Sequence, residues 1–462
     1  MRIRRPCVGL IALTLAGCGA SHPQYSFDPP SRLSTDHRDH HEPHNNESVP
    51  KPSETKEVSL HGILAYADQN SPLLGISRAE LLRGDAAISG TKPLFPSDPT
   101  VSLSAGPRIG ADGTGLDVSL GLQQELEISG ARGLRREAAE RFHDVKSMEV
   151  EEVRWVVHRR VHALFHQALV ARDRTIAATD FLTFAESLVS IAERRLKAGD
   201  ISPLGVRVAQ GELAQAKQAK IAADGAYRSV QITLAEVAGW PATQLPVPAG
   251  ELDAPRKAPD QKSLLALAEQ NNTRLQTRVA QTRWAEANQH LADRDAWPKP
   301  SVGLQYTRES DSAAGIGGGA EADVLLFGIS LPIPLWRKNV AARSQAKAEV
   351  MVAQATHTAE RQRLTARVLR AANQVDVGAD RIAAYGSEIL PTFEKNLTML
   401  RRAFELGEIE VLDVSVAQRR FLEIQQSALT AYQEYYQAVS TLEQVVGAEV
   451  WPEERHDAGE SE

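Results

Sequence analysis

The amino-acid sequence predicts a mainly α-helical protein with a membrane β-barrel, built from two tandem repeats of a β-hairpin and long coiled-coil helices. Three features of the sequence predict this fold class. The central part of the chain is duplicated, each copy contains two segments in which apolar and polar residues alternate, and each copy continues into a very long segment rich in helix-forming residues. Such a chain divides its residues between a sheet in a membrane and a long helical body.

The duplication is visible as short matches at nearly constant spacing. Residues 199–210 resemble residues 407–418 after a shift of 208 positions, and residues 99–103 resemble residues 300–304 after a shift of 201. The shift changes only between segments, as insertions in loops would require. Self-similarity at a fixed spacing indicates repeated structural units. We interpret the body of the chain as two repeats, with bounds 58–258 and 259–452.

Each repeat contains two alternating segments joined by a glycine-rich link. They span 101–105 and 116–122 in the first repeat and 302–306 and 325–333 in the second. Alternation at period two is typical of a transmembrane barrel strand, whose apolar side chains face lipid and whose polar side chains face the lumen. The predicted lumen-facing side chains are those of Ser119, Gln123, Gln305 and Thr307. The glycine-rich links lack the Lys-Ser/Thr of a phosphate loop, so we interpret them as hairpin loops.

Long helices are predicted at 131–198 and 339–406, each followed by a second helix at 203–239 or 410–447. The two long segments contain no proline except Pro391. A helix of this size is roughly 100 Å long, which no globular core requires. Apolar residues at three- and four-residue spacing favour coiled-coil packing along that length.

Four strands in one chain cannot close a barrel, and an open sheet edge is not tolerated in lipid. Two chains would supply eight strands, which enclose little more than their own side chains, whereas three supply twelve, enough for an aqueous lumen. We therefore expect a homotrimer. After the leader, no stretch of eighteen consecutive residues is wholly apolar, so we expect no transmembrane helix.

The N-terminus predicts export and a lipid anchor. Residues 1–17 contain three arginines followed by a short apolar run, as in a secretory signal peptide. The run ends in Leu-Ala-Gly-Cys, which resembles the lipobox of bacterial lipoproteins and predicts lipidation of Cys18. The alternative is an ordinary signal peptide that contains a cysteine. Residues 18–57 and 453–462 have compositions typical of a disordered tether and a disordered acidic tail.

Composition excludes several classes of function. Cys7 belongs to the leader and Cys18 to the anchor, so the mature body has no thiol for disulfides or zinc. Removal of the leader, with its three arginines, takes the net charge from −7 to −10, which argues against nucleic-acid binding. The sequence has no nucleophile elbow, metal triad or dinucleotide fingerprint. We expect neither enzyme activity nor a cofactor.

Over about residues 58–450, the duplicated units, the lipobox and the repeated glycine turns resemble the TolC family of outer-membrane efflux factors. The resemblance implies a trimer with a twelve-stranded barrel in the outer membrane and a helical tunnel in the periplasm. It also implies two partners, a periplasmic adaptor protein and an inner-membrane RND-type pump. The expected location is the outer membrane, with a lipid anchor and a periplasmic helical domain.

Two short motifs resemble the CzcC-like, heavy-metal branch of this family. Residues 331–339 are similar to its PLPLF.RN strand-to-helix junction, and residues 127–132 are similar to its ELGGKR junction. This branch implies a passive conduit for heavy-metal cations. A drug or other small-molecule efflux channel of the same family is an alternative. A periplasmic adaptor lipoprotein is another, although it would have one helical hairpin instead of repeated strand pairs.

In the family, the helix turns around the repeated glycine form the periplasmic tip, which closes the channel and contacts the adaptor. The resemblance thus assigns the gate and docking tip to Gly199, Asp200, Gly407, Glu408, Glu410 and Asp413. Asp413 matches one family aspartate, whereas Gly205 and Val416 stand where two further acids would fall. In the family, acids at these positions form a ring at the tip of the channel. The resemblance therefore implies a ring with fewer acids in this chain. Alternatively, these are exposed acids that stabilise a helix N-terminus through its dipole.

Three histidines, His158, His162 and His166, recur every four residues on one face of the first long helix. An i, i+4 histidine pair can chelate a divalent metal. The alternative is a polar flank beside the apolar seam of the same helix. The tether carries further histidines that could bind zinc or copper, or could simply belong to a solvated linker: His22, His37, His40, His41 and His44.

Overall fold

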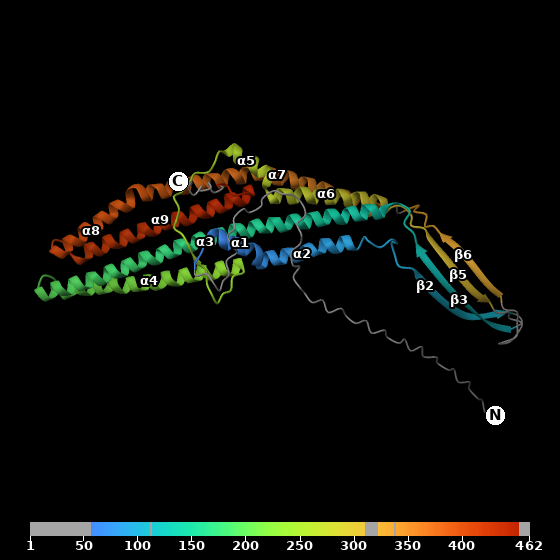
Figure 1. Ribbon diagram of the computed structural model, residues 1–462, viewed down its shortest axis with the longest axis horizontal. Coiled ribbons are helices and arrows are strands. Elements are labelled where there is room, and N and C mark those ends of the chain that lie inside the picture. Colours follow the sequence, from blue (N-terminus) through green and yellow to red (C-terminus); the bar gives the residue numbers. More distant parts are fainter. Residues whose placement is uncertain (1–56, 111–112, 310–321, 337–338, 452–462) are drawn as a thin grey trace, which may run out of the picture. The chain divides into compact units, whose positions relative to one another are not determined.

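A computed structural model of the chain describes residues 57–110, 113–309, 322–336 and 339–451. The leader, Cys18, the tether histidines and the acidic tail lie outside the described residues, as does the glycine-rich link at 315–319. In the described residues, one order of elements occurs twice: two helices, two strands and two long helical segments, the first of which is divided in the second copy (Figure 1).

The first copy consists of α1 (Leu60–Asn70), α2 (Pro72–Ser89), β2 (Thr100–Gly110), β3 (Gly113–Glu125), α3 (Ala131–Ala198) and α4 (Pro203–Ala238). The second consists of α5 (Gln261–Asn271), α6 (Thr273–Arg294), β5 (Ser301–Glu309), β6 (Ala322–Ser330), α7 (Val340–Ala384), the π-helix η1 (Tyr385–Ile389), α8 (Leu390–Leu406) and α9 (Val411–Val446). A short parallel pair, β1 (Glu57–Val58) with β4 (Val247–Pro248), ties the start of the first copy to the linker between the copies.

The four long strands form one antiparallel sheet in the order β2-β3-β5-β6. Its register places the predicted apolar residues side by side across all four strands, in the rows Val101–Leu122–Leu304–Phe327 and Leu103–Leu120–Tyr306–Leu325. The predicted polar residues share the opposite face, where the Ser119 and Thr307 hydroxyls lie 3.0 Å apart. One face of the sheet is therefore continuously apolar, and most of its side chains are exposed in the single chain.

The sheet is open in one chain. Among the described residues, no strand pairs with the outer edge of β2 or of β6. The last strand also ends earlier than predicted, at Ser330 instead of 333. Pro332 has no N–H to donate to a ladder, so the apolar residues after Ser330 continue as an exposed extended segment.

The two long helices differ from each other. The first spans 131–198 without interruption, as predicted. The second was predicted as one helix over 339–406, but η1 divides it into α7 and α8. Pro391 explains the break, because a proline inside a helix lacks one hydrogen bond and its ring clashes with the carbonyl four residues earlier. A π-turn just before the proline relieves this clash.

Of the described helices, α3 alone contains an 18-residue window that is apolar enough to cross a membrane by length and composition. This holds although no eighteen consecutive residues are all apolar. The helix packs against α2, α4, α6 and α9, and its Phe165 and Leu169 are buried between helices. Its apolar residues therefore form part of the packing inside the helical body.

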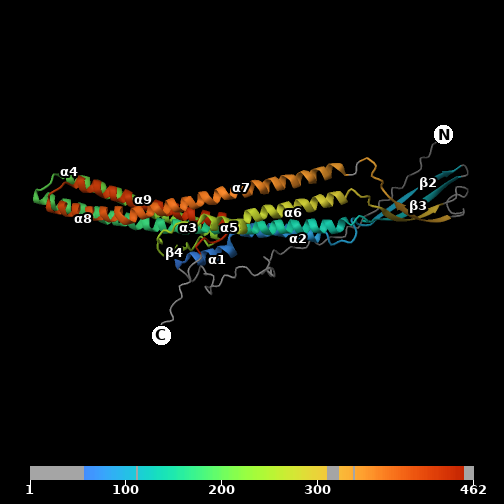
Figure 2. The same ribbon diagram turned by 90° about the horizontal axis from the view of Figure 1, so that it is seen from above.

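Each copy has its own apolar core. The first joins α1, α3 and α4 around Ile63, Val161 and Leu234, and the second joins α5, α7 and α9 around Leu264, Val375 and Leu442. Helix α9 packs on α3 as well as on α7, so it connects the two copies in the half of the helical body that contains α4 and α8 (Figure 2).

Two equivalent glycines close these cores. Gly239 ends α4 and Gly447 ends α9, at φ angles of 75° and 77°. A Cβ at Gly239 would lie 2.1 Å from the carbonyl oxygen of Asn70, and one at Gly447 would lie 2.2 Å from that of Asn271. Only a residue without a side chain fits so close to a backbone with a positive φ.

We expect Gly239→Ala and Gly447→Ala each to lower the free energy of unfolding by about 2–4 kcal/mol, because both add backbone strain and a clash that a side chain cannot relieve. Thermal unfolding followed by circular dichroism measures this. Gly211→Ala is the matched control, since Gly211 lies within α4 with open space around it. Alanine there should be neutral or stabilising by roughly 0.5–1 kcal/mol. Equal effects at Gly211 and Gly239 would contradict the explanation.

Candidate functional site

The two repeated turns lie together at the end of the helices opposite the sheet (Figure 1). The α3–α4 turn contains residues 199–202 and the α8–α9 turn contains residues 407–410. A shared apolar cluster packs beneath them, with contributions from all four helices: Leu188, Ile191, Ala192, Val206, Ala209, Phe404, Val411 and Val414. The sequence match between the turns therefore corresponds to a single site built from both repeats.

Both turns use the same helix cap. The Gly199 N–H donates to the carbonyl of Leu196 at 3.0 Å, and the next N–H, of Asp200, donates to that of Arg195 at 2.9 Å. At the second turn, Gly407 and Glu408 make the equivalent bonds at 3.1 and 2.9 Å. Both glycines have left-handed φ angles, of 81° and 86°. This is the Schellman arrangement, which explains why the repeated residue is glycine.

Arg195 links the first turn to the second. Its guanidinium donates to the carbonyl oxygens of Phe404 at 3.2 Å and Ile409 at 3.5 Å. The same group lies 5.1 Å from the centroid of the buried Phe404 ring. The equivalent position in the second repeat is Ala403, so the second repeat has no side chain that could make the same link back to the first turn. Sequence reasoning missed Arg195, because a basic residue in the last helical turn is common for dipole reasons alone.

The predicted acidic residues of the tip, Asp200, Glu408, Glu410 and Asp413, are all exposed. Two of them also form a capping box at the start of α9. The Glu410 N–H donates to a carboxylate oxygen of Asp413 at 3.3 Å, and the Glu410 side chain accepts from the Asp413 N–H. Asp413 therefore stabilises a helix end in addition to placing a charge at the tip.

Exposed apolar side chains flank the acids. Leu204 and Leu412 occupy equivalent positions after the two turns and are 68% and 52% exposed. Val416, where the family resemblance would place an acid, is 54% exposed. The tip of a single chain thus combines negative charge with unpartnered apolar surface, a combination typical of a docking surface.

The three predicted histidine ligands lie on one face of α3, but their imidazoles do not converge. The Nε2 atoms of His158 and His162 each lie 3.9 Å from the Oε2 atom of Glu443 on α9. His166 Nδ1 instead lies 3.0 Å from the His162 carbonyl, and its ring stacks on Tyr436 at 3.7 Å. As they stand, the described residues contain no group of three or more histidine, cysteine or acidic side chains arranged to hold a metal ion.

Burial dominates the electrostatics of these groups. It lowers the pKa of His158 to about 4 and also lowers that of His162. It raises the pKa of the Glu443 carboxyl to about 8, with a further rise from the nearby Glu449. At neutral pH the imidazoles are therefore uncharged. Sequence reasoning missed Glu443, because it lies in the other repeat and only tertiary packing brings it to α3.

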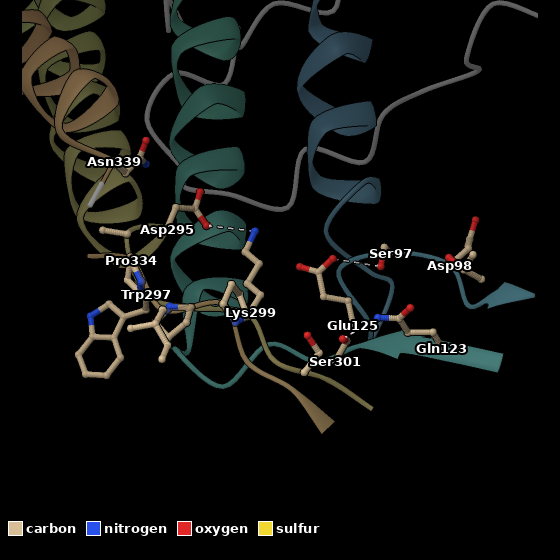
Figure 3. Close-up of a pocket in the computed structure, with 16 residues that line it drawn as sticks. Ser97, Asp98, Gln123, Glu125, Asp295, Trp297, Lys299, Ser301, Pro334 and Asn339 are labelled. Carbon is tan, nitrogen blue, oxygen red and sulfur yellow. Dashed lines mark hydrogen bonds and ion pairs between the residues drawn. The ribbon is translucent and has the colours of Figure 1, made fainter. Parts of the chain in front are cut away.

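An open cavity of about 930 Å³ lies where the sheet meets the helices (Figure 3). Its lining comes from the ends of both strand hairpins and includes Gln123, Ser301 and Trp297. Two of its acids contact neighbours: Asp295 Oδ1 lies 3.8 Å from Lys299 Nζ, and the Ser97 hydroxyl donates to a Glu125 carboxylate oxygen at 3.5 Å. The cavity is therefore a feature of the junction between the strands and the helices.

The chain matches the family described as "Outer membrane efflux protein" over residues 67–240 and 264–448. It is 26% identical to the cobalt-zinc-cadmium resistance protein CzcC of Cupriavidus metallidurans over 324 residues, which cover 70% of this chain and 75% of that protein. It is 25% identical to the pyoverdine export outer membrane protein OpmQ of Pseudomonas putida, over 42% of this chain and 41% of that one. Among solved structures, the fold is similar to CusC, with a TM-score of 0.69 and 17% identity over 87% of this chain and 96% of that chain.

We expect Arg195→Ala to loosen the second turn more than the first. The substitution removes two charge-assisted hydrogen bonds, worth about 1–2 kcal/mol at this partly exposed position. Amide hydrogen exchange over residues 403–410 should accelerate about 5- to 30-fold. Arg195→Lys should fall between, because lysine keeps the charge without the guanidinium fork. The exposed Arg207→Ala on α4 is the control, and equal acceleration by it would refute a specific link.

Proposed function

The chain belongs to the outer membrane efflux protein family, and from this premise we propose that it is a trimeric, lipid-anchored channel that exports heavy-metal cations as the outer component of a tripartite system. Membership of the family means that the chain is an outer-membrane efflux channel, and so a transport protein. The observation that carries the proposal is the pairing, in one chain, of an open amphipathic sheet with a two-turn helical tip.

The open sheet supports the trimer. Its apolar face spans four strands, and the outer edges of β2 and β6 carry backbone groups that lipid cannot satisfy. Pairing β6 of one chain with β2 of the next would satisfy both edges, and three copies would give twelve strands with the polar face around a lumen. A detergent-purified assembly with three chain masses supports this arrangement, and a stable water-soluble monomer contradicts it.

The amino-acid sequence supports the proposed lipid anchor. Residues 15–18 resemble a lipobox, so we assign the lipid to Cys18. Labelling by a palmitate analogue should be lost in Cys18→Ser, and unchanged labelling would remove the anchor from the proposal. The barrel could still insert, because its apolar face gives an independent attachment to the membrane.

The tip supports the gate and the partners. Acidic and apolar side chains are exposed together around the Gly199 and Gly407 turns, and Arg195 holds these turns to each other. We assign the gate and the docking surface for a periplasmic adaptor to this tip. The adaptor would connect the channel to an inner-membrane RND-type pump, which would select the cargo.

The heavy-metal cargo rests on similarity to CzcC, a protein named for cobalt-zinc-cadmium resistance, and on the junction motifs at 127–132 and 331–339. A small-molecule cargo is the second candidate, because a shorter match links the chain to a protein named for pyoverdine export.

Deletion of the gene in its host tests the cargo. We expect the minimal inhibitory concentrations of cobalt, zinc and cadmium to fall several-fold, because the channel would be the only outer exit of its pump, and the wild-type gene to restore them. Sensitivity to lipophilic drugs and siderophore release should not change. The opposite pattern would replace the metal cargo by a small molecule while leaving the channel in place.

The charge of the tip can be separated from its capping role at Asp413. Asp413→Asn keeps an oxygen that can accept the Glu410 N–H but removes the charge, whereas Asp413→Ala removes both. In planar-bilayer recordings both variants should lower cation preference about 2-fold, because a ring of carboxylates concentrates cations in a narrow pore. Only Asp413→Ala should also fray the start of α9, at a cost of about 0.5–2 kcal/mol. If Asp200→Asn alters selectivity and Asp413→Asn does not, the assignment of Asp413 is wrong.

A further inference from the structure

The helices next to the sheet leave two faces uncovered in a single chain. In the part of the chain that the structure describes, they form a row in the order α2-α3-α6-α7 (Figure 1 and Figure 2). The outer members of the row expose large apolar side chains: Ile76 on α2 is 64% exposed, and Val352 on α7 is 65% exposed. Exposed apolar surface at both edges is typical of a contact with another protein.

The duplication identifies the contact that corresponds to these faces. Gly121 of β3 and Gly328 of β6 occupy matching places in their hairpins. Val161 of α3 and Val368 of α7 lie in the two repeat cores. Both pairs are 207 residues apart, so α7 is the equivalent of α3. Helix α2 is the equivalent of α6 after the shift of 201 residues that also relates the strands after them.

The contact between α3 and α6 within one chain therefore has a counterpart between α7 and α2. These two helices lie at opposite edges of the row, with α3 and α6 between them. At about 8–10 Å per packed helix, the edges are roughly 25–30 Å apart. The counterpart can therefore form only between two chains.

The α3–α6 contact shows what such an interface contains. The Phe142 and Trp284 rings lie 5.4 Å apart between their centroids, and the Thr277 hydroxyl lies 3.4 Å from the carbonyl oxygen of Met148. Val145 follows Phe142 by one helical turn on the same side of α3. Thr277 is 2% exposed and Val145 is 3% exposed, so this contact excludes water.

Two equivalent positions are buried inside the chain and exposed at its edges. The equivalent of Thr277 is Ile76, and the equivalent of Val145 is Val352. The edge residues are at least as apolar as the buried ones, yet both are more than half exposed. A second copy of the chain that repeats the α3–α6 contact would cover both of them.

The remaining pair differs in chemistry and is complementary in charge. Trp284 corresponds to Arg83 and Phe142 corresponds to Glu349, so an aromatic pair within the chain becomes a base and an acid at the two edges. Both side chains are exposed. Within the chain, Arg83 pairs with Glu80 at 3.0 Å, an exposed contact that contributes little and that Arg83 can exchange for another. Charged side chains also keep the free edges soluble before assembly, which an exposed Phe and Trp would not.

We propose that α7 of one chain packs on α2 of the next, antiparallel as in the α3–α6 contact, with Glu349 opposite Arg83 of the neighbouring chain. Ile76 and Val352 are buried between these helices. The apolar residues supply the affinity, and the ion pair selects the alignment, because a like-charge alternative is repelled. The inference rests on the proposed trimer and specifies the surface through which its chains meet.

Charge reversal tests the ion pair in the full-length protein, purified in detergent. Glu349→Arg and Arg83→Glu should each raise the monomer fraction about 5-fold or more, because each places like charges face to face. The double variant should return it to within about 2-fold of wild type. Lys347→Glu is the control, because Lys347 is exposed on another side of α7 and its reversal should have no effect. Light scattering during size-exclusion chromatography measures the monomer and trimer fractions.

Cross-linking tests the alignment independently. Glu349→Cys combined with Arg83→Cys should give a covalent trimer with a short bismaleimide, and neither single variant should. Asp85→Cys combined with Glu349→Cys is the matched control, because Asp85 lies on the α3 side of α2, with its Oδ1 atom 3.4 Å from His143 Nε2. Cys18 is common to all variants and therefore does not affect the comparison.

The outcomes separate this contact from the trimer itself. A wild-type assembly of three chain masses without the expected cross-link, or without rescue by the double reversal, would overturn the α7–α2 contact and leave the trimer standing. Cross-linking of the Asp85 pair instead would overturn the alignment. A wild-type protein that is monomeric in detergent would overturn the proposed trimer and this contact with it.

Discussion

The packing of α9 against both α3 and α7 is the interaction on which the rest of this structure depends. Each repeat has its own core, and α9 joins the two cores in addition to the contact of α3 with α6 and the shared sheet. Because α9 crosses from one repeat to the other, it places the Gly407 turn beside the Gly199 turn and brings Glu443 to His158 and His162. Its Tyr435 hydroxyl also donates to the carbonyl of Arg256 in the linker between repeats. The tip and the buried cluster are both consequences of this one helix contact.

The duplication explains the features that occur twice, and the departures from it locate what is specific to each repeat. The helix caps and the closing glycines have the same geometry in both copies, because the same backbone conformation requires the same residue. Arg195, the histidine stripe and the uninterrupted α3 belong to the first copy, whereas the π-helix before Pro391 belongs to the second. The link between the turns and the polar cluster therefore use residues that the repeats do not share. A duplicated chain can in this way keep one scaffold and still make its two halves unequal.

The sheet and the tip are stable in different surroundings. The sheet presents rows of exposed leucine, valine and phenylalanine that water solvates poorly, and its polar face has hydroxyls and amides that already bond to one another. The tip exposes carboxylates around a small apolar patch. An environment that is apolar at one end and aqueous at the other satisfies both, as expected for an outer-membrane channel.

The sequence by itself determined whatever depends on short-range pattern. Period-two alternation located all four strands and their apolar face, and the absence of proline together with a composition rich in helix-forming residues located α3 to the residue. The repeated glycines located both turns, because a left-handed cap requires a particular residue at a particular place. It did not reveal the early end of β6, the π-helix, or the dual role of Asp413, which depend on backbone hydrogen bonds that composition does not specify. Only the tertiary structure decided that Arg195 reaches the second turn and that Glu443, not His166, completes the group around His158 and His162. Those contacts join residues more than two hundred positions apart, and the energy that selects them comes from packing whole helices against each other, which no local pattern encodes.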